Sequence, residues 1–430
     1  MISIIKKKIT SDFFKDSFWA LLGNVIFRGS GLVSSIFLAK ILQKNEYGEF
    51  NSLKNTLTTL AIFTTFGLGY TSTKFVAECL SGSKKDPKEL ISKIYKIAII
   101  FSVIIGFLTF IFAPQMSEFY YNNAEFDLRI RILSFWIVLM ALSTAQNGVI
   151  AGLGIFKKFT TVNILIGIIT LIFIPLLAFY YGTVGACVSL LLIQTLNCII
   201  NEYFIRKNIG IYNRLEPFPI RFTSILSYSL PLTLIEAIFS VCLWINYFLI
   251  QNHFNYGEVA LYSTSMQWYI LLLFIPMVLK NVVLSYFSNK NSEKDIFKNA
   301  ILLSLISTVI PVVFILIFSP YIEKLYGENF AGLGDLIRIM AIIPIFSSIS
   351  SVMEQYLFSK SKNWIVFTFS LVKDGGTCLL FLYFIEYVGV KEAAYYLILS
   401  YLILNSITFS AYILLFLKTG LHKDQTIQTL

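Results

Sequence analysis

The sequence carries little charge for its length. Of its 430 residues only 13% are charged, while 57% are hydrophobic and the mean hydropathy is +0.75. Soluble globular proteins carry about 25% charged residues, and a chain with half of that cannot cover a water-facing surface of this size. A soluble enzyme is therefore excluded, and an aromatic content of 16% excludes a disordered chain. At about 20 apolar residues per span, the composition predicts an all-α integral membrane protein with about twelve transmembrane helices.

Histidine is scarce and the cysteines are not paired. The chain has two histidines and five cysteines, and no two cysteines stand in a CxxC spacing. This composition indicates neither a disulfide framework nor a metal site, and we expect no cofactor. The net charge of +10 comes from basic residues in twos and threes between apolar runs. Such spacing is typical of topology determinants and not of a nucleic-acid groove, so no nucleic-acid partner is expected.

Apolar runs separated by polar breaks predict the membrane spans. They cover residues 17–39, 53–77, 94–113, 132–153, 160–181, 184–205, 225–250, 259–287, 299–319, 336–358, 363–386 and 393–417. Lys and Arg are concentrated in alternate connections, on the side that also holds both chain ends. The positive-inside rule therefore predicts a multi-pass protein with both termini in the cytoplasm.

Short motifs recur in the same order along the two halves of the chain. Tyr47-Gly48-Glu49 follows the first predicted span, and Tyr256-Gly257-Glu258 follows the seventh. At the same offset, Gln146 in the fourth span corresponds to Gln355 in the tenth. Six spans is an even number, so both halves run the same way through the membrane, related by an axis along the membrane normal.

This repeat predicts two pseudo-symmetric six-helix lobes around a central cavity. We expect an N-terminal lobe over residues 1–210, a cytoplasmic linker over 211–222 and a C-terminal lobe over 223–430. Two lobes suit alternating access, in which one lobe rocks against the other around a site at the membrane midplane. The architecture favours a transporter over a channel, because channels more often place their pore on an axis between subunits.

Several charged residues fall inside the predicted spans. Arg28 lies at the centre of the first span, where an arginine costs about 2.5–3.5 kcal/mol on insertion scales, so it is expected to face a cavity or a partner. Asn24 and Gly31 share its helix face. Lys373 lies mid-span in the eleventh span, while Lys74 stands near a span end, where snorkelling to the headgroups explains it equally well.

Two carboxylates also fall in apolar spans. Glu236 lies in the seventh span and Asp374 follows Lys373 in the eleventh. Burial disfavours ionisation of a carboxylate, so either group is a candidate for coupling to a proton or sodium gradient. The alternative is structural: Arg28 forms an ion pair with Glu236 or Asp374, or the neighbours Lys373 and Asp374 partly neutralise each other.

Several motifs resemble those of a known family. Ala39-Lys40-Ile41-Leu42 with Tyr47-Gly48-Glu49-Phe50 resembles the end of the first span and the following loop of Wzx-type polysaccharide flippases. Gly67-Leu68-Gly69-Tyr70, Lys74 to Glu78 and Gln146-Asn147-Gly148 are similar to that family's second and fourth spans. These flippases belong to the multidrug/oligosaccharidyl-lipid/polysaccharide exporter superfamily, and the likeness runs over most of the chain.

The resemblance implies a transporter, not an enzyme, in the bacterial inner membrane. It implies flipping of an undecaprenyl-diphosphate-linked oligosaccharide from the cytoplasmic to the outer leaflet, for O-antigen and lipopolysaccharide biosynthesis, with membrane lipids and the polysaccharide polymerase as partners. A diphosphate crossing hydrocarbon needs compensating charge, which arginine's planar fork supplies well. The residues expected to bind this substrate are Arg28, Lys74, Lys373, Asn24, Gln146 and Gln355.

Two other functions remain open from the sequence. A cation-coupled multidrug exporter of the same superfamily is expected to have an acidic cavity, whereas the mid-span basic residues here at least match the acids. A membrane-embedded glycan polymerase or ligase usually needs a sizeable outside loop. The longest outside connection, 114–131, contains no paired-carboxylate or nucleophile constellation.

Overall fold

The computed structural model describes residues 2–65, 67–81, 86–209, 222–277, 293–360 and 362–419. Their regular structure is helical, and the chain divides into two compact units, Met1–Ser240 and Val241–Leu430. The predicted linker, 211–222, lies outside the described residues except for Phe222. The lobe boundaries expected from the sequence therefore stay a prediction.

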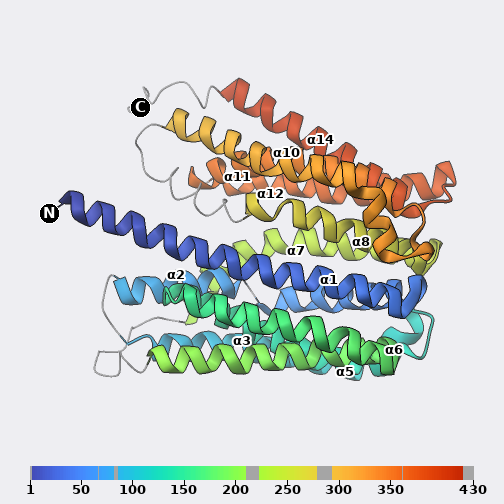
Figure 1. Cartoon of the computed structure of the whole chain (residues 1–430), viewed down its shortest axis with the longest axis horizontal. Helices are drawn as coiled ribbons and strands as arrows, with labels where there is room; N and C mark the ends of the chain where they lie inside the picture. The colour runs from blue at the N-terminus through green and yellow to red at the C-terminus, as the bar shows by residue number, and fades with distance from the viewer. Residues whose placement is uncertain are drawn as a thin grey trace. The chain divides into compact units, whose positions relative to one another are not determined.

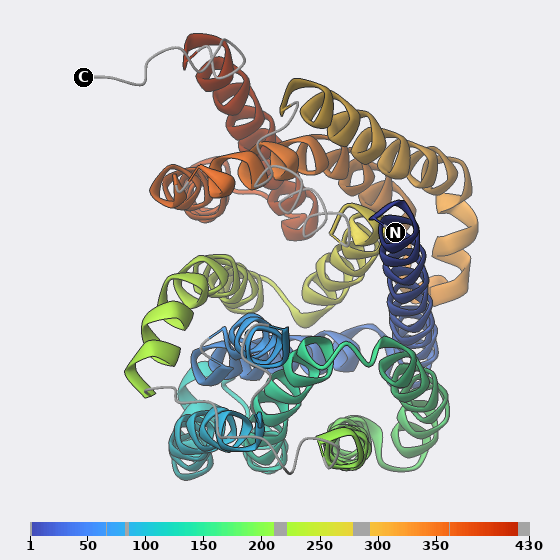
Figure 2. The same ribbon diagram turned by 90° about the vertical axis from the view of Figure 1, so that its left-hand side faces the viewer.

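The N-terminal unit is a bundle of long helices (Figures 1 and 2). Its elements are α1 (Ile2–Thr65), α2 (Leu68–Ser81), α3 (Lys88–Ile111), α4 (Ala113–Gln115), η1 (Met116–Tyr120), α5 (Phe126–Gly152), α6 (Phe156–Ile209) and the first part of α7 (Phe222–His253). Helix α5 packs against α2, α3 and α6, and α1 packs along α6. In Figure 2 the blue-to-green helices of this unit are seen nearly end-on.

Two of these helices join two predicted spans each across a sharp kink. In α1 the kink is at Gln43, with φ 58°, and in α6 it is at Gly182, with φ 59°. The loop expected after the first span is therefore wrong: Tyr47 and Phe50 are helical and buried. At each kink the chain changes direction at one residue with a positive φ. Glycine adopts this backbone conformation readily, whereas Gln43 adopts it only at a cost in free energy.

The second predicted span is interrupted. Helix α1 ends at Thr65 and α2 begins at Leu68, with Gly67 between them at φ 58°. A glycine with positive φ ends the helical path, since side-chain-bearing residues rarely take that conformation. The span that the sequence marks as rich in glycine, serine and threonine is thus two helices within the described residues.

The C-terminal unit centres on α11. Its elements are the second part of α7, α8 (Tyr256–Leu272), α10 (Glu293–Tyr326), η3 (Glu328–Phe330), α11 (Leu333–Ser359), α12 (Asn363–Ser370), η4 (Leu371–Gly375), α13 (Gly376–Tyr383), η5 (Phe384–Val388) and α14 (Ala393–Thr419). Helix α11 packs against α8 (yellow in Figure 1) and against α10 and α14 (orange and red). From Asn363 to Val388 the helical path is continuous, with π-helical turns at η4 and η5.

The helices account for the predicted spans. Eight stretches among the described residues are long and apolar enough to cross a membrane, and the two that contain kinks correspond to two predicted spans each. Helices α7 and α8 correspond to the seventh and eighth spans, the latter as far as residue 277. The ninth ends later than expected, because α10 continues through Pro320 to Tyr326. The all-α membrane fold is confirmed.

Helices α2 and α5 approach each other closely at Gly148. A Cβ atom there would collide with the carbonyl oxygen of Gly69 and lie 2.8 Å from the Cβ of Ser72. The Thr73 hydroxyl donates a hydrogen bond to the Gly148 carbonyl at 3.1 Å. Small residues allow such backbone approach between membrane helices, so the glycine of the Gln146-Asn147-Gly148 motif serves packing.

We therefore expect Gly148→Ala to destabilise the protein. The collision is with backbone, which cannot rotate away, and overpacking of this kind costs about 1–3 kcal/mol. The measurement is the melting temperature and folded yield in detergent. Gly29→Ala is the matched control, because a Cβ at Gly29 meets nothing within 4 Å. Equal melting temperatures for the two variants would contradict the packing role.

Candidate functional site

The C-terminal unit holds an ion pair inside an apolar span. Lys373 Nζ lies 3.6 Å from Asp374 Oδ1, with the side chains 23% and 5% exposed. Both residues belong to the apolar stretch Trp364–Val388, and both lie in the π-helical turn η4. The expectation that these neighbours partly neutralise each other is confirmed. A π-helical turn is uncommon inside a helix and is found frequently at functional sites.

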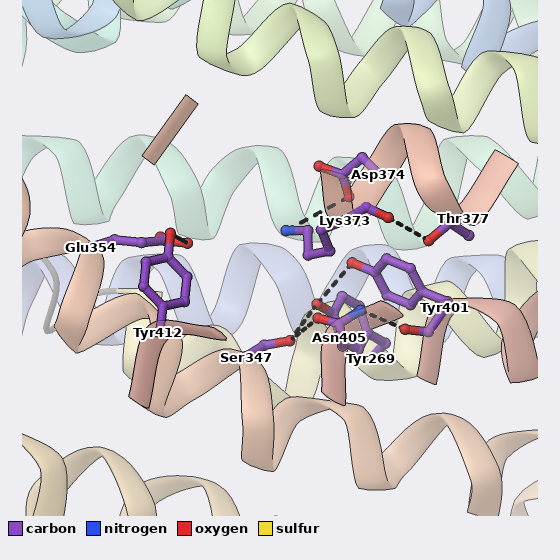
Figure 3. Close-up of polar contacts among 9 residues, drawn as sticks. All are labelled: Tyr269, Ser347, Glu354, Lys373, Asp374, Thr377, Tyr401, Asn405 and Tyr412. Atoms are coloured by element: carbon purple, nitrogen blue, oxygen red, sulfur yellow. Dashed lines mark hydrogen bonds and ion pairs between the residues drawn. The ribbon is translucent and has the colours of Figure 1, made fainter. Parts of the chain in front are cut away.

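Four polar side chains gather beside this pair from three other helices. Figure 3 shows Tyr269 of α8, Ser347 of α11, and Tyr401 and Asn405 of α14 grouped next to Lys373. The Tyr269 hydroxyl lies 3.2 Å from the Ser347 hydroxyl and 3.1 Å from the Tyr401 hydroxyl. Ser347 donates to Asn405 Oδ1 at 3.0 Å. Both tyrosines and Asn405 are buried.

The donor count gives this hydroxyl chain a direction. A hydroxyl has one proton to donate, and that of Ser347 goes to Asn405 Oδ1. The Ser347 oxygen must then accept from Tyr269, and the Tyr269 oxygen must accept from Tyr401. Asn405 completes the path by donating from Nδ2 to the Tyr401 carbonyl at 2.7 Å. The hydrogen bonds therefore run one way from Tyr401 to Asn405.

Lys373 brings an ammonium group with three N–H donors to the cluster. At 3.6 Å its contact with Asp374 is an ion pair and longer than a hydrogen bond. Tyr269 and Glu354 contribute to its electrostatic surroundings, and Tyr412 donates to Glu354 Oε1 at 3.5 Å. The cluster thus offers a buried acid, a cation and ordered hydroxyls, groups that can exchange a proton or hold an anionic oxygen.

Arg28 lies on α1 in the other unit, and its side chain is exposed. Helix α1 packs on α6 through a different face: Ser34 donates to the Thr170 carbonyl at 3.0 Å, and a Cβ at Gly23 would lie 2.8 Å from Thr160 Cα. Next to Arg28, a Cβ at Gly31 would meet nothing within 4 Å. The polar face with Asn24, Arg28 and Gly31 is therefore not the face that packs on α6.

The same helix also exposes an apolar face. Phe37 is 50% exposed. It stands two and a half turns from Arg28 at 3.6 residues per turn, so the two side chains leave the helix in opposite directions. In a membrane the exposed aromatic ring suits acyl chains, whereas an exposed guanidinium does not. Phe37 and Arg28 thus lie on opposite sides of α1, while the apolar Val25, 50% exposed, stands three residues before Arg28 on the same side of the helix.

The remaining predicted site residues have other surroundings. Gln146 is 1% exposed, and its Nε2 donates to the Cys198 carbonyl and to Glu202 Oε2, both at 3.2 Å, which joins α5 to α6. Lys74 Nζ lies 4.0 Å from Glu78 Oε1 near one end of α2. The amide of Gln146 is thus engaged within the bundle.

The other two predicted residues lie on α7 and α11. Glu236 is half-buried on α7, within electrostatic range of the Tyr70 hydroxyl, and Gln355 is buried on α11. The structure therefore brings Lys373 and Asp374 together, whereas Arg28, Lys74, Gln146 and Glu236 belong to the other compact unit. Substrate binding and ion coupling by these residues stay predictions.

A pattern in the sequence indicates the residues of α14 that were not predicted as part of the site. Tyr401, Asn405, Thr408 and Tyr412 follow the spacing i, i+4, i+7, i+11, the same spacing that marks the polar face of Arg28. All four are buried in α14. A polar stripe of this kind in an apolar helix indicates a face turned toward other helices, so it pointed to the cluster around Lys373.

Comparison with known proteins gives a family and a fold. Residues 13–283 match the family model described as "Polysaccharide biosynthesis protein". Over 126 residues the chain is 26% identical to "Uncharacterized membrane protein MJ1068" of Methanocaldococcus jannaschii, an alignment that covers 29% of this chain and only 25% of that protein.

Solved structures of the same fold cover nearly the whole chain. An inward-facing multidrug resistance MATE family transporter of the MOP superfamily superposes with a TM-score of 0.77 at 15% identity, over 94% of this chain and 96% of the other. An outward-facing structure gives a TM-score of 0.70, also at 15% identity, over 95% of each chain. At this identity the likeness establishes the fold.

Proposed function

Because the chain belongs to the polysaccharide biosynthesis protein family, we propose that it is a flippase for a lipid-linked oligosaccharide. Its substrate would be an undecaprenyl-diphosphate-linked oligosaccharide, which it would move from the cytoplasmic to the outer leaflet of the plasma membrane by alternating access. The product would feed O-antigen or another surface polysaccharide, with the polysaccharide polymerase as the next protein. The positive-inside distribution of Lys and Arg supports cytoplasmic termini.

The exposed position of Arg28 on α1 is the observation that carries this proposal. It stands on a membrane helix, on the same face as Asn24 and opposite the exposed Phe37. A diphosphate entering the membrane loses its hydration, and a guanidinium can replace it with two parallel charge-assisted hydrogen bonds. Asn24 on the same face can hydrogen-bond sugar hydroxyls.

The Lys373 cluster would supply the second half of the mechanism. The three N–H donors of the Lys373 ammonium group suit a phosphate oxygen. When the ammonium turns to an anion, Asp374 loses its partner and takes up a proton or a sodium ion. Coupling to an ion gradient through Asp374, or through Glu236 on α7, is part of this proposal. The one-way hydroxyl chain beside the pair fixes the polar surroundings in which the exchange would occur.

The MATE fold alone would also accommodate an exporter of cationic drugs. The basic residues within the membrane spans weigh against that function. A cavity for cations is expected to present acidic groups, whereas Arg28 is exposed and Asp374 is already paired with Lys373. The family match also favours a role in polysaccharide biosynthesis over drug export.

Deletion of the gene tests the proposal directly. We expect loss of surface polysaccharide and accumulation of lipid-linked oligosaccharide on the cytoplasmic leaflet, both restored by the wild-type chain. Drug susceptibility, measured on the same strain with a panel of cationic compounds, should be unchanged. Normal surface polysaccharide together with increased susceptibility would instead establish the drug exporter.

A further inference from the structure

A pocket of about 610 Å³ lies between α3 and α6 in the N-terminal unit. Its lining includes Lys88, Tyr95, Lys96 and Ile99 of α3, and Ile205 and Arg206 of α6. The basic residues stand near the first residue of α3 and the last residue of α6, where both helices reach the end of their membrane stretch. Isoleucines form much of the rest of the lining. The pocket thus combines cations with an apolar floor at a membrane boundary.

The charges in this pocket do not cancel. Glu202, its one acidic lining residue, has both oxygens engaged: Oε1 accepts from Arg206 Nε at 2.6 Å, and Oε2 accepts from Gln146. Arg206 therefore balances Glu202. Lys88 and Lys96 are exposed, and neither forms an ion pair with any described residue.

Two acidic residues near the pocket contact groups other than the ammonium groups of Lys88 and Lys96. Glu89 pairs with Lys93 at 2.6 Å, and neither lines the pocket. Asp86 precedes α3 and accepts a hydrogen bond from the backbone N–H of Lys88 at 3.0 Å. Two uncompensated ammonium groups remain at the pocket.

An exposed apolar ridge continues from the pocket along α3. Ile99 lines the pocket, and Val103, Phe107 and Ile111 follow it at helical spacing with 47%, 62% and 47% of their surfaces exposed. An apolar strip of this length on a membrane helix is the surface that acyl chains cover. A molecule with an anionic head and an apolar tail matches the pocket and the ridge together.

We propose that this pocket binds the headgroup of an anionic phospholipid, with the acyl chains along the ridge of α3. Lys88 and Lys96 hold the phosphate, and Tyr95 and Ser92 provide hydroxyl groups beside it. Basic residues at the cytoplasmic ends of membrane helices attract anionic lipids in this way. The site is separate from the residues assigned to the flipped substrate and does not depend on that assignment.

Lipid binding by the purified full-length chain tests this site. Native mass spectrometry from micelles doped with phosphatidylglycerol should show retained lipid, with phosphatidylcholine bound at least about tenfold more weakly. In Lys88→Gln/Lys96→Gln, each removed lysine should weaken phosphatidylglycerol binding about fivefold, so the pair weakens it about 25-fold. The matched control is Lys93→Gln/Lys207→Gln, which removes two charges from the same helices outside the pocket lining and should bind as wild type.

The following results would overturn the proposal. They are equal binding by the pocket variant and wild type, equal retention of the two lipids, and displacement of bound phosphatidylglycerol by millimolar inorganic phosphate, which would assign the site to a free anion. The melting temperature of each variant without added lipid confirms that it is folded. A loss of binding shared by pocket and control variants would show a diffuse charge effect and would also contradict a site.

Discussion

Arg28→Ala is expected to lower the rate of flipping about 100-fold while leaving the amount of folded protein in the membrane unchanged. Arg28 is exposed and lies off the face that packs on α6, so its removal opens no cavity in that helix contact. A hydrogen bond to a charged group contributes about 1.5–3 kcal/mol, and 1.4 kcal/mol corresponds to a factor of ten. Surface polysaccharide in a complemented deletion strain, normalised to the protein level in the membrane, gives the measurement.

A second substitution at the same position separates charge from shape. Arg28→Lys keeps the positive charge but loses the planar fork that contacts two phosphate oxygens, so we expect about a tenfold loss. Phe37→Ala, on the opposite side of the helix, is the control and should flip at the wild-type rate. Normal surface polysaccharide in Arg28→Ala would defeat the assignment of Arg28, as would equal defects in Arg28→Ala and Phe37→Ala.

Replacing one member of the Lys373–Asp374 pair is expected to destabilise the protein, and replacing both should not. Asp374→Asn leaves an ammonium group without its partner in an apolar span, and breaking a buried pair costs about 3–5 kcal/mol. We expect the lower end, since the pair is 3.6 Å long and Lys373 keeps 23% exposure. Lys373→Met/Asp374→Leu should be about as stable as wild type, because apolar replacement of a whole buried pair is often neutral. Unfolding in mixed detergent micelles measures both.

Transport by the double variant distinguishes function from structure. If the pair acts in transport, Lys373→Met/Asp374→Leu is stable but flips poorly. Glu89→Gln is the control for Asp374→Asn: Glu89 pairs with Lys93, but these side chains are 50% and 31% exposed, so the change should cost under about 0.5 kcal/mol. Wild-type transport by the double variant would reduce the pair to a structural contact.

Span number and helix type could be predicted from the sequence because membrane helices are long and uniformly apolar. The kinks could not. Gln43 takes φ 58° in a stretch that has the composition of a loop, and nothing local distinguishes a turn from a reversal within one helix. Gly67 belongs to a motif visible in the sequence, but its interruption of the span depends on the backbone conformation at one residue.

Only part of the candidate site could be predicted from the sequence. A charge in an apolar span is visible in the sequence, so Lys373, Asp374 and Arg28 were identified. Tyr269 and Ser347 come from different helices, and their contact depends on how α8 and α11 pack. Gln146 shows the reverse problem: an amide in a span suggests a binding group, whereas its hydrogen bonds join α5 to α6.

The most direct test of the account is flipping by the purified chain in liposomes that contain a fluorescent polyprenyl-diphosphate-linked oligosaccharide. The leaflet that holds the sugar is read by its access to an impermeant reagent. We expect the wild-type chain to move the lipid many times faster than empty liposomes do, and Arg28→Ala to approach the empty-liposome rate. A wild-type rate equal to that of empty liposomes, or to that of Arg28→Ala, would contradict a flippase that uses Arg28 to receive a diphosphate.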